Sequence, residues 1–196
     1  MNQEYIEKAK KAIKYGECKS QEPLLVILMG LPGTGKSYIS NYLNKQYSFT
    51  ILSGENITYS IFGTEKCTGL QYRESYEILR FLAVYLLKQK YNVVIDGTNL
   101  KYEFRKQIYQ SVGDLAKIIL VYIYIDDATA LKRANSRKED SSDLKAISGK
   151  CSLETFITFK NQLELPREDE LYYKFKSDEN ILKKIDIIIY DNRCVI

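Results

Sequence analysis

The sequence predicts an α/β protein in which a five-stranded parallel sheet lies between two layers of helices. Short apolar runs alternate with longer amphipathic segments along the chain. Helices between consecutive strands provide the crossover connections that a parallel sheet requires. The first apolar run, LLVILM at 24–29, contains no polar residue, which is typical of a strand buried on both faces. Helices on both faces of such a sheet give a doubly wound, three-layer domain.

The other elements follow from the same alternation. The charged segment 2–15 carries a thin apolar stripe and is expected to be a helix that ends near Gly16. The further strands are predicted at 49–52, 92–96, 117–125 and 184–190, the last with the sequence KIDIIIY. The further helices are predicted at 36–46, 56–62, 71–90, 101–111, 127–137 and 152–161, with a turn at Pro166. We therefore expect an N-terminal helical segment, 1–22, appended to a single domain at 23–196.

The amino-acid composition excludes several classes of mechanism and of binding partner. The chain has 196 residues, a net charge of +4 and no histidine, so mechanisms that need an imidazole are excluded. The charge permits an anionic substrate but is far from that of a dedicated nucleic-acid binder. The four cysteines lie far apart without a C-x-x-C pair, which favours free thiols in a reducing compartment.

The location of the protein is predicted from its apolar segments. The N-terminus, MNQEYIEKAKKAIKYGE, is charged throughout and does not resemble a signal peptide. No apolar run approaches the ~20 residues that span a bilayer. We expect a cytoplasmic protein without membrane association.

The strongest motif is GLPGTGKS at 30–37, which fits G-x-x-x-x-G-K-[ST] at every fixed position. Glycines let backbone N–H groups converge on phosphate oxygens, and the following helix directs its positive end at the same anion. In this motif Lys36 neutralises the β- and γ-phosphates, and the Ser37 hydroxyl can bind Mg²⁺. A chance glycine-rich turn would have to reproduce both the motif and its strand-before, helix-after setting. The residues expected to contact a nucleotide are Gly30, Leu31, Pro32, Gly33, Thr34, Gly35, Lys36, Ser37 and Tyr38.

Two carboxylates follow predicted strands. Asp96 ends the strand 92–96, and the carboxyl ends of parallel strands are where ligands bind. Asp96 can hold Mg²⁺ or position a substrate hydroxyl, or it can simply cap the next turn. Glu55 follows the second strand and can take a proton from an attacking hydroxyl. The alternative for Glu55 is a helix N-terminal carboxylate stabilised by the helix dipole.

Two arginines precede a polar stretch. Arg133 and Arg137 are four residues apart on a predicted helix and share one of its faces. They lead into the polar segment 136–150, so they can form a lid that stabilises charge in a transition state. The alternative is a solvated helix face paired with acids such as Glu139.

With these residues in view, the chain from about 24 to 191 resembles the P-loop kinases that include polynucleotide 5′-kinases and zeta-toxin-type kinases. The resemblance rests on GLPGTGKS, on VVIDGTNL with Arg105 shortly after it, and on the arginines of LKRANSR. It implies a three-layer P-loop NTPase fold of kinase type, ATP and Mg²⁺ as ligands, and an arginine-containing lid. It also implies that Asp96 serves the substrate or the metal and that Arg133 and Arg137 bind phosphates.

One departure from the family bears on the acceptor. The family commonly has an Asp after the second strand, with an Arg three residues later, where this chain has Glu55 and Thr58. A Glu can still act as a base on a longer arm. Without the Arg, a contact to an acceptor phosphate is missing, which argues against a nucleotide or polynucleotide acceptor without excluding it.

Three classes of function remain open from the sequence. The leading one is a kinase that moves the ATP γ-phosphoryl group to a hydroxyl on a nucleic acid 5′ end or a small metabolite. A switch or motor ATPase is the second, although we find no guanine-reading N-K-x-D and only one acid in VVIDG. The third is an ATP-binding module without kinase turnover.

Overall fold

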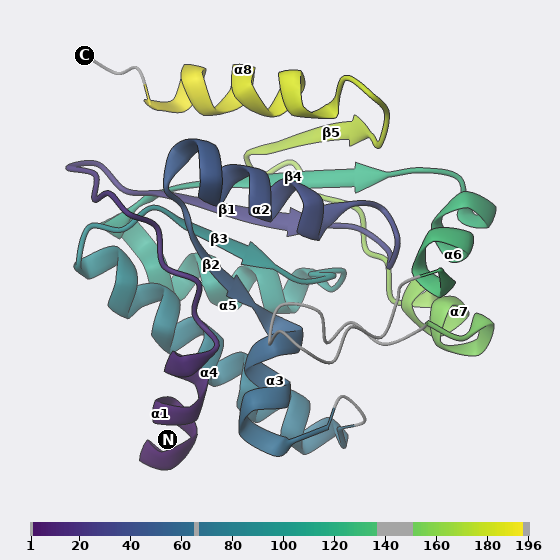
Figure 1. The fold of residues 1–196 in the computed structure, drawn as a ribbon, viewed down its shortest axis with the longest axis horizontal. Helices are drawn as coiled ribbons and strands as arrows, with labels where there is room; N and C mark the ends of the chain where they lie inside the picture. The colour runs from purple at the N-terminus through teal and green to yellow at the C-terminus, as the bar shows by residue number, and fades with distance from the viewer. Residues whose placement is uncertain (1, 65–66, 137–150, 194–196) are drawn as a thin grey trace.

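The structure, a computed structural model, describes residues 2–64, 67–136 and 151–193. Its centre is an all-parallel sheet with the strand order β2-β3-β1-β4-β5 (Figure 1). The strands are β1 (Leu24–Met29), β2 (Thr50–Ser53), β3 (Val93–Asp96), β4 (Lys117–Tyr124) and β5 (Tyr172–Lys176). The predicted fold class, a five-stranded parallel sheet with helices, is therefore confirmed.

Helices cover both faces of this sheet. They are α1 (Gln3–Lys11), α2 (Lys36–Tyr47), α3 (Gly54–Phe62), α4 (Gly69–Lys88), α5 (Tyr102–Val112), α6 (Asp127–Asn135), α7 (Leu153–Asn161) and α8 (Ile181–Arg193), with a 3-10 turn η1 at Gly113–Leu115. In Figure 1, α2 lies in front of the sheet and α5 behind it, while α6 and α7 lie beyond the carboxyl ends of the strands. None of the helices in the described part of the chain combines the length and apolar character that a membrane span requires.

The position of β1 at the centre of the sheet explains why its sequence is apolar throughout. Leu25, Ile27 and Met29 of β1 pack into the core formed with α1, α3, α4 and α5. Leu24, Val26 and Leu28 point to the other face and pack against α2 and α8. Because successive side chains of a strand point to opposite faces, a strand covered on both sides needs an apolar residue at every position.

The strand predicted at 184–190 is wrong, because this segment lies inside α8. The run of β-branched isoleucines favours a strand by propensity. The buried isoleucines of α8, however, recur at helical spacing, i, i+4, i+7 and i+8: Ile181, Ile185, Ile188 and Ile189. The fifth strand is instead the edge strand β5, in which Tyr173 and Phe175 pack against the core and their neighbours are exposed.

The N-terminal helix also differs from its prediction. It ends at Lys11 with Ala12 as its C-cap, and Gly16 does not end it. Gly16 is instead a point of close chain approach, since a Cβ there would lie 1.8 Å from the Ser48 carbonyl oxygen. Helix α1 buries Ile6 and Ala9, with Ala9 part of the same core as α3 and α4. The division of the chain at residue 23 stays a prediction.

Candidate functional site

The loop between β1 and α2 has the backbone that its glycines were expected to permit. Gly30 has φ +150°, and a Cβ there would lie 2.3 Å from the Ile123 carbonyl oxygen. Gly33 has φ +83°, and its Cβ would lie 2.0 Å from the Ala130 carbonyl oxygen. L-amino acids with a side chain rarely adopt these angles, and both contacts are to backbone atoms. Only glycine therefore fits these two positions.

Lys36 begins α2 and folds back over this loop. Its Nζ donates hydrogen bonds of 2.9 Å to the carbonyl oxygens of both Gly30 and Leu31, and the residue is 7% exposed. The Thr34 hydroxyl donates to the same Leu31 carbonyl at 2.9 Å. These bonds hold a positive charge, largely shielded from solvent, at the mouth of the loop.

Asp96 lies beside the loop because β3 is the neighbour of β1 in the sheet. It is the last residue of β3 and is 8% exposed. Its Oδ2 accepts a 2.9 Å hydrogen bond from the Ser40 hydroxyl. Ser40 lies one turn after Ser37 on α2, so the two serines share a helix face. The carboxylate is thus fixed in direction and faces the start of α2.

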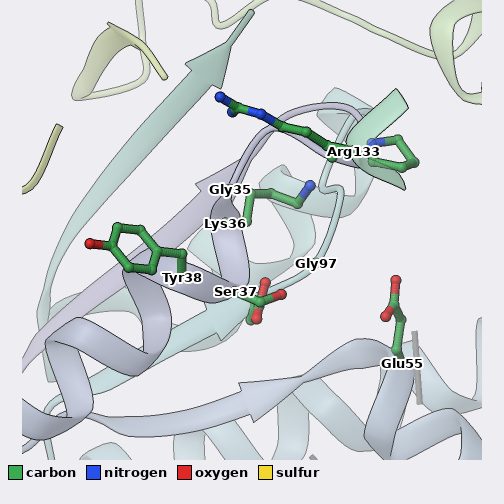
Figure 2. A pocket seen from close by; sticks show the side chains of 10 residues that line it. Gly35, Lys36, Ser37, Tyr38, Glu55, Gly97 and Arg133 are labelled. Carbon is green, nitrogen blue, oxygen red and sulfur yellow. The ribbon is translucent and has the colours of Figure 1, made fainter. Parts of the chain in front are cut away.

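A cavity of about 280 Å³ opens where these elements meet. Figure 2 shows Lys36 and Ser37 at the start of α2, and Glu55 facing them across the opening from α3. The residues that line it come from four elements and their loops: Pro32, Gly33, Gly35, Lys36, Ser37, Tyr38, Glu55, Asp96, Gly97 and Arg133. The structure therefore brings together most of the site residues predicted from the sequence.

Glu55 owes its position to the start of α3. The helix begins at Gly54, earlier than predicted, and Ser53 is its N-cap, with the side chain accepting from the Asn56 backbone N–H at 3.3 Å. Glu55 thus lies in the first turn, where the helix dipole stabilises a carboxylate, and it also lines the cavity. Both interpretations of this residue agree with the structure.

The arginine pair is described only in part. Arg133 lies on α6 and lines the cavity, and its Nη1 donates a 3.1 Å hydrogen bond to the Ser177 hydroxyl after β5. Helix α6 ends at Asn135. Arg137, Glu139 and the predicted lid at 136–150, apart from Ser136, lie outside the described residues, so the lid stays a prediction.

A buried ion pair that the sequence did not reveal fixes the loop after Asp96. Arg105 of α5 is 0% exposed, and its Nε and Nη2 donate to the Glu170 carboxylate at 2.7 and 2.9 Å. Its Nη1 donates to the carbonyl oxygens of Asn99 and Leu100 at 3.0 and 2.9 Å. Burial opposes ionisation of Glu170, but hydrogen bonds from Arg105 and Tyr109 outweigh it and lower the pKa of this carboxyl.

The loop held by this ion pair contacts the phosphate-binding loop directly. The Gly30 N–H donates to the Thr98 carbonyl oxygen at 3.1 Å, and the Asn99 side-chain amide donates to the Leu28 carbonyl oxygen at 2.7 Å. Asn99 has φ +46° and is 1% exposed. Arg105 thus supports the site through the backbone of 97–100. Arg105 and Glu170 lie far apart in the sequence. No local pattern therefore identifies them as partners.

Comparisons with known proteins agree with this geometry. Residues 25–158 match a protein family described as an AAA domain. The chain belongs to this P-loop, kinase-like family. No curated protein matches the sequence.

Solved structures share the fold of this AAA domain at low sequence identity. A gluconokinase from Sinorhizobium meliloti 1021 is 15% identical with a TM-score of 0.60, over 88% of this chain and 98% of its own. Kti12 from Chaetomium thermophilum, in complex with ADP-AlF3, is 15% identical with a TM-score of 0.60, over 87% of this chain and 99% of its own. A chain of the Pnkp1/Rnl/Hen1 RNA repair complex is 21% identical with a TM-score of 0.56, over 77% of this chain and 50% of its own.

Proposed function

We propose that this AAA domain is an ATP-dependent kinase that transfers the γ-phosphoryl group to a hydroxyl acceptor. One observation carries the proposal. A single cavity is lined by the phosphate-binding loop, by Asp96 and, across the opening, by Glu55. A domain that only holds ATP needs the loop, whereas a transferase also needs a base on the far side of the γ-phosphate. The similarity of the fold to that of a gluconokinase agrees with this class.

The donor side is assigned to the loop and to the start of α2. Backbone N–H groups of 30–37 and the helix N-terminus would bind the β- and γ-phosphates. Lys36 would exchange its loop carbonyls for phosphate oxygens, and it neutralises charge that develops on the bridging oxygen.

The oxygen donors at this site fit Mg²⁺. The ion favours hydroxyl and carboxylate ligands, and at nucleotide sites it keeps several waters and takes only one or two protein ligands. Ser37 and Asp96 line the same cavity and would hold it, with Ser40 keeping the carboxylate in place. When bound, the ion supplies charge neutralisation on the phosphates.

The acceptor side is assigned to Glu55. The carboxylate takes the proton of the acceptor hydroxyl as that oxygen forms a bond to the γ-phosphorus. The bond between the γ-phosphorus and the bridging oxygen breaks, and ADP leaves with the electron pair. Arg133, together with Arg137, is proposed to stabilise the charge spread over the transferred group. Positioning and charge neutralisation therefore supply most of the rate.

ADP formation with and without candidate acceptors tests the proposal. Acceptor-dependent ADP formation supports a kinase, acceptor-independent formation a switch or motor, and ATP binding without either a binding module. Lys36→Ala should abolish ADP formation, whereas Lys45→Ala, an exposed lysine at the far end of the same helix, should leave it unchanged. Full turnover by Lys36→Ala would overturn the assignment.

Glu55→Gln separates the base from the phosphate-binding residues. Loss of a general base typically lowers kcat by about 10²- to 10⁴-fold, and the KM for ATP should stay near that of the unmodified protein. We also propose a cytoplasmic location, which the free thiols of Cys18 and Cys67 support.

A further inference from the structure

A cavity of about 550 Å³ lies at the amino ends of the strands, at the opposite end of the sheet from α6 and α7 (Figure 1). Its walls come from residues 18–22 before β1, the end of α2, the residue before β3 and the last turn of α8. It shares no described lining residue with the cavity that holds Lys36 and Asp96. We propose that this cavity is a binding site for a neutral sugar, separate from the site of the proposed kinase reaction.

Asn92, the residue before β3, provides the main sign of a ligand. It is 4% exposed and lines the cavity. Its Oδ1 accepts a 2.9 Å hydrogen bond from the Leu24 N–H. Because that N–H can only donate, the amide oxygen faces β1, and the NH₂ group is left for the cavity. This NH₂ group makes no hydrogen bond within the described part of the chain. Donors in such buried residues are normally paired, so a ligand atom that accepts a hydrogen bond fits here.

Neutral polar side chains supply the other hydrogen bonds that the cavity offers. Gln46 and Ser48 line it at the end of α2. Asn192 of α8 donates from its Nδ2 to the Ile188 carbonyl oxygen at 2.7 Å and to the Tyr173 hydroxyl at 3.3 Å, which leaves its Oδ1 as an acceptor. The wall thus presents both donors and acceptors. A hydroxyl group also donates and accepts, so a ligand with several hydroxyls matches this wall.

The charge around the cavity favours a neutral ligand. Lys19 and Glu22 are the charged residues among its described lining, and their charges offset each other. The Lys19 Nζ lies 5.1 Å from the centroid of the Tyr91 ring, which holds this cation against an aromatic face. Both α2 and α8 place their last turns at the cavity. The C-terminal ends of helices carry partial negative charge and disfavour an anion, while the donor of Asn92 disfavours a cation.

The size of the cavity agrees with a sugar of one or two rings. Cavities that bind small molecules usually measure about 300–1,000 Å³, and this one measures about 550 Å³. Tyr47 supplies the one aromatic ring of the described lining, and its hydroxyl donates to Asp186 at 2.8 Å. A nucleobase favours flat partners on its faces, whereas the C–H face of a sugar can pack on a single aromatic ring.

The cavity and the proposed nucleotide site lie at opposite ends of one helix. Lys36 and Ser37 begin α2, whereas Gln46 and Ser48 lie at its end. At 1.5 Å per residue, the 12 residues of α2 span about 18 Å. A sugar in this cavity would therefore not reach the phosphate-binding loop, and its binding can be measured without turnover.

An NMR titration of the whole chain with three related sugars tests the proposal. Glucose is neutral, glucuronate adds a carboxylate, and glucosamine adds an ammonium group. We expect glucose to bind with a Kd on the order of 1 mM and the two charged derivatives to bind at least about fivefold more weakly. No binding of glucose, or tighter binding of either charged derivative, would overturn the assignment of the ligand class.

Variants of the wall locate the bound sugar. Asn92→Asp keeps an oxygen for the Leu24 N–H but replaces the NH₂ group by a second oxygen, so the Kd for glucose should rise by about tenfold. Gln46→Ala removes an exposed side chain and should raise this Kd by about fivefold, the effect of one hydrogen bond. Gln110 is also exposed, lies on α5 and is outside the described cavity linings. Gln110→Ala is therefore the matched control and should leave the Kd unchanged.

These variants also separate the sugar site from the proposed kinase site. Glucose binding that is unchanged by Gln46→Ala would overturn the inference, and this exposed position keeps the test valid if Asn92→Asp does not fold. Loss of glucose binding in Glu55→Gln, with Gln46→Ala unaffected, would place the sugar at the proposed acceptor side and likewise overturn it. A chain that binds glucose in this cavity but forms no ADP would refute the kinase proposal alone.

Discussion

The buried ion pair between Arg105 and Glu170 leads to a quantitative prediction about stability. The Glu170 carboxylate accepts hydrogen bonds from Arg105 Nε at 2.7 Å, Arg105 Nη2 at 2.9 Å, the Tyr109 hydroxyl at 2.5 Å and the Arg167 N–H at 2.8 Å. Glu170→Gln removes the charge and replaces one acceptor oxygen by an NH₂ group that cannot accept. About two of these bonds are lost, each contributing roughly 1.5–3 kcal/mol because a charge is involved.

We therefore expect Glu170→Gln to lower the free energy of unfolding by about 3–5 kcal/mol, the range for breaking a buried pair from one side. Urea denaturation followed by far-UV circular dichroism measures this change. Lys184→Ala is the control, because it removes an ion pair with Asp178 of 2.8 Å whose side chains are 34% and 35% exposed. Exposed pairs of this kind contribute about 1 kcal/mol or less.

A double variant guards against a single variant that does not fold. Arg105→Met combined with Glu170→Leu leaves no buried charge, so it should be more stable than Glu170→Gln. A loss below about 1 kcal/mol for Glu170→Gln would refute the argument that this pair supports the loop after Asp96.

Three other predictions concern the loop, the metal site and pH. Gly33→Ala should abolish binding of an ATP analogue in equilibrium dialysis, because its Cβ would lie 2.0 Å from the Ala130 carbonyl oxygen; retained affinity would contradict the geometry. Ser40→Ala removes the 2.9 Å hydrogen bond to Asp96 and should raise the Mg²⁺ concentration for half-maximal ADP formation by about tenfold, with ATP affinity in the absence of metal unchanged. The pKa of Glu170 is lowered from 4.5 in the folded protein. Its stabilisation is therefore complete above the unfolded pKa of about 4.5 and is lost as the pH falls through the folded pKa. Glu170→Gln should flatten the acid limb of a plot of unfolding free energy against pH, and an unchanged limb would argue against this carboxylate.

The parts of the site that local sequence determines could be predicted. The glycines and lysine of GLPGTGKS form a motif whose spacing by itself predicts the loop. The position of Asp96 in the site follows from its place at the end of a strand next to β1. The isoleucine run of α8 misled the prediction because β propensity and helical spacing gave opposite answers, and packing against the sheet decided in favour of the helix.

The remaining contacts depend on tertiary structure. Arg105 and Glu170 form their ion pair only after separate elements have packed together. For the same reason, Tyr76 of α4 and Phe159 of α7 come to line one cavity. A buried arginine such as Arg105 carries no mark in the sequence that distinguishes it from a solvated one, because both have the same local pattern.

Helix α8 has a consequence for how the chain folds during synthesis. Its isoleucines supply much of the apolar cover on one face of β1 and β4, and its Asp186 accepts hydrogen bonds from the Tyr42 and Tyr47 hydroxyls of α2 at 2.7 and 2.8 Å. The phosphate-binding loop is translated early, yet Tyr42 and Tyr47 of α2 gain their hydrogen bonds to Asp186 only after residues 181–189 have left the ribosome. Nucleotide binding by nascent chains should therefore appear only after α8 emerges, and chaperones that recognise exposed apolar strands would have this whole interval in which to bind.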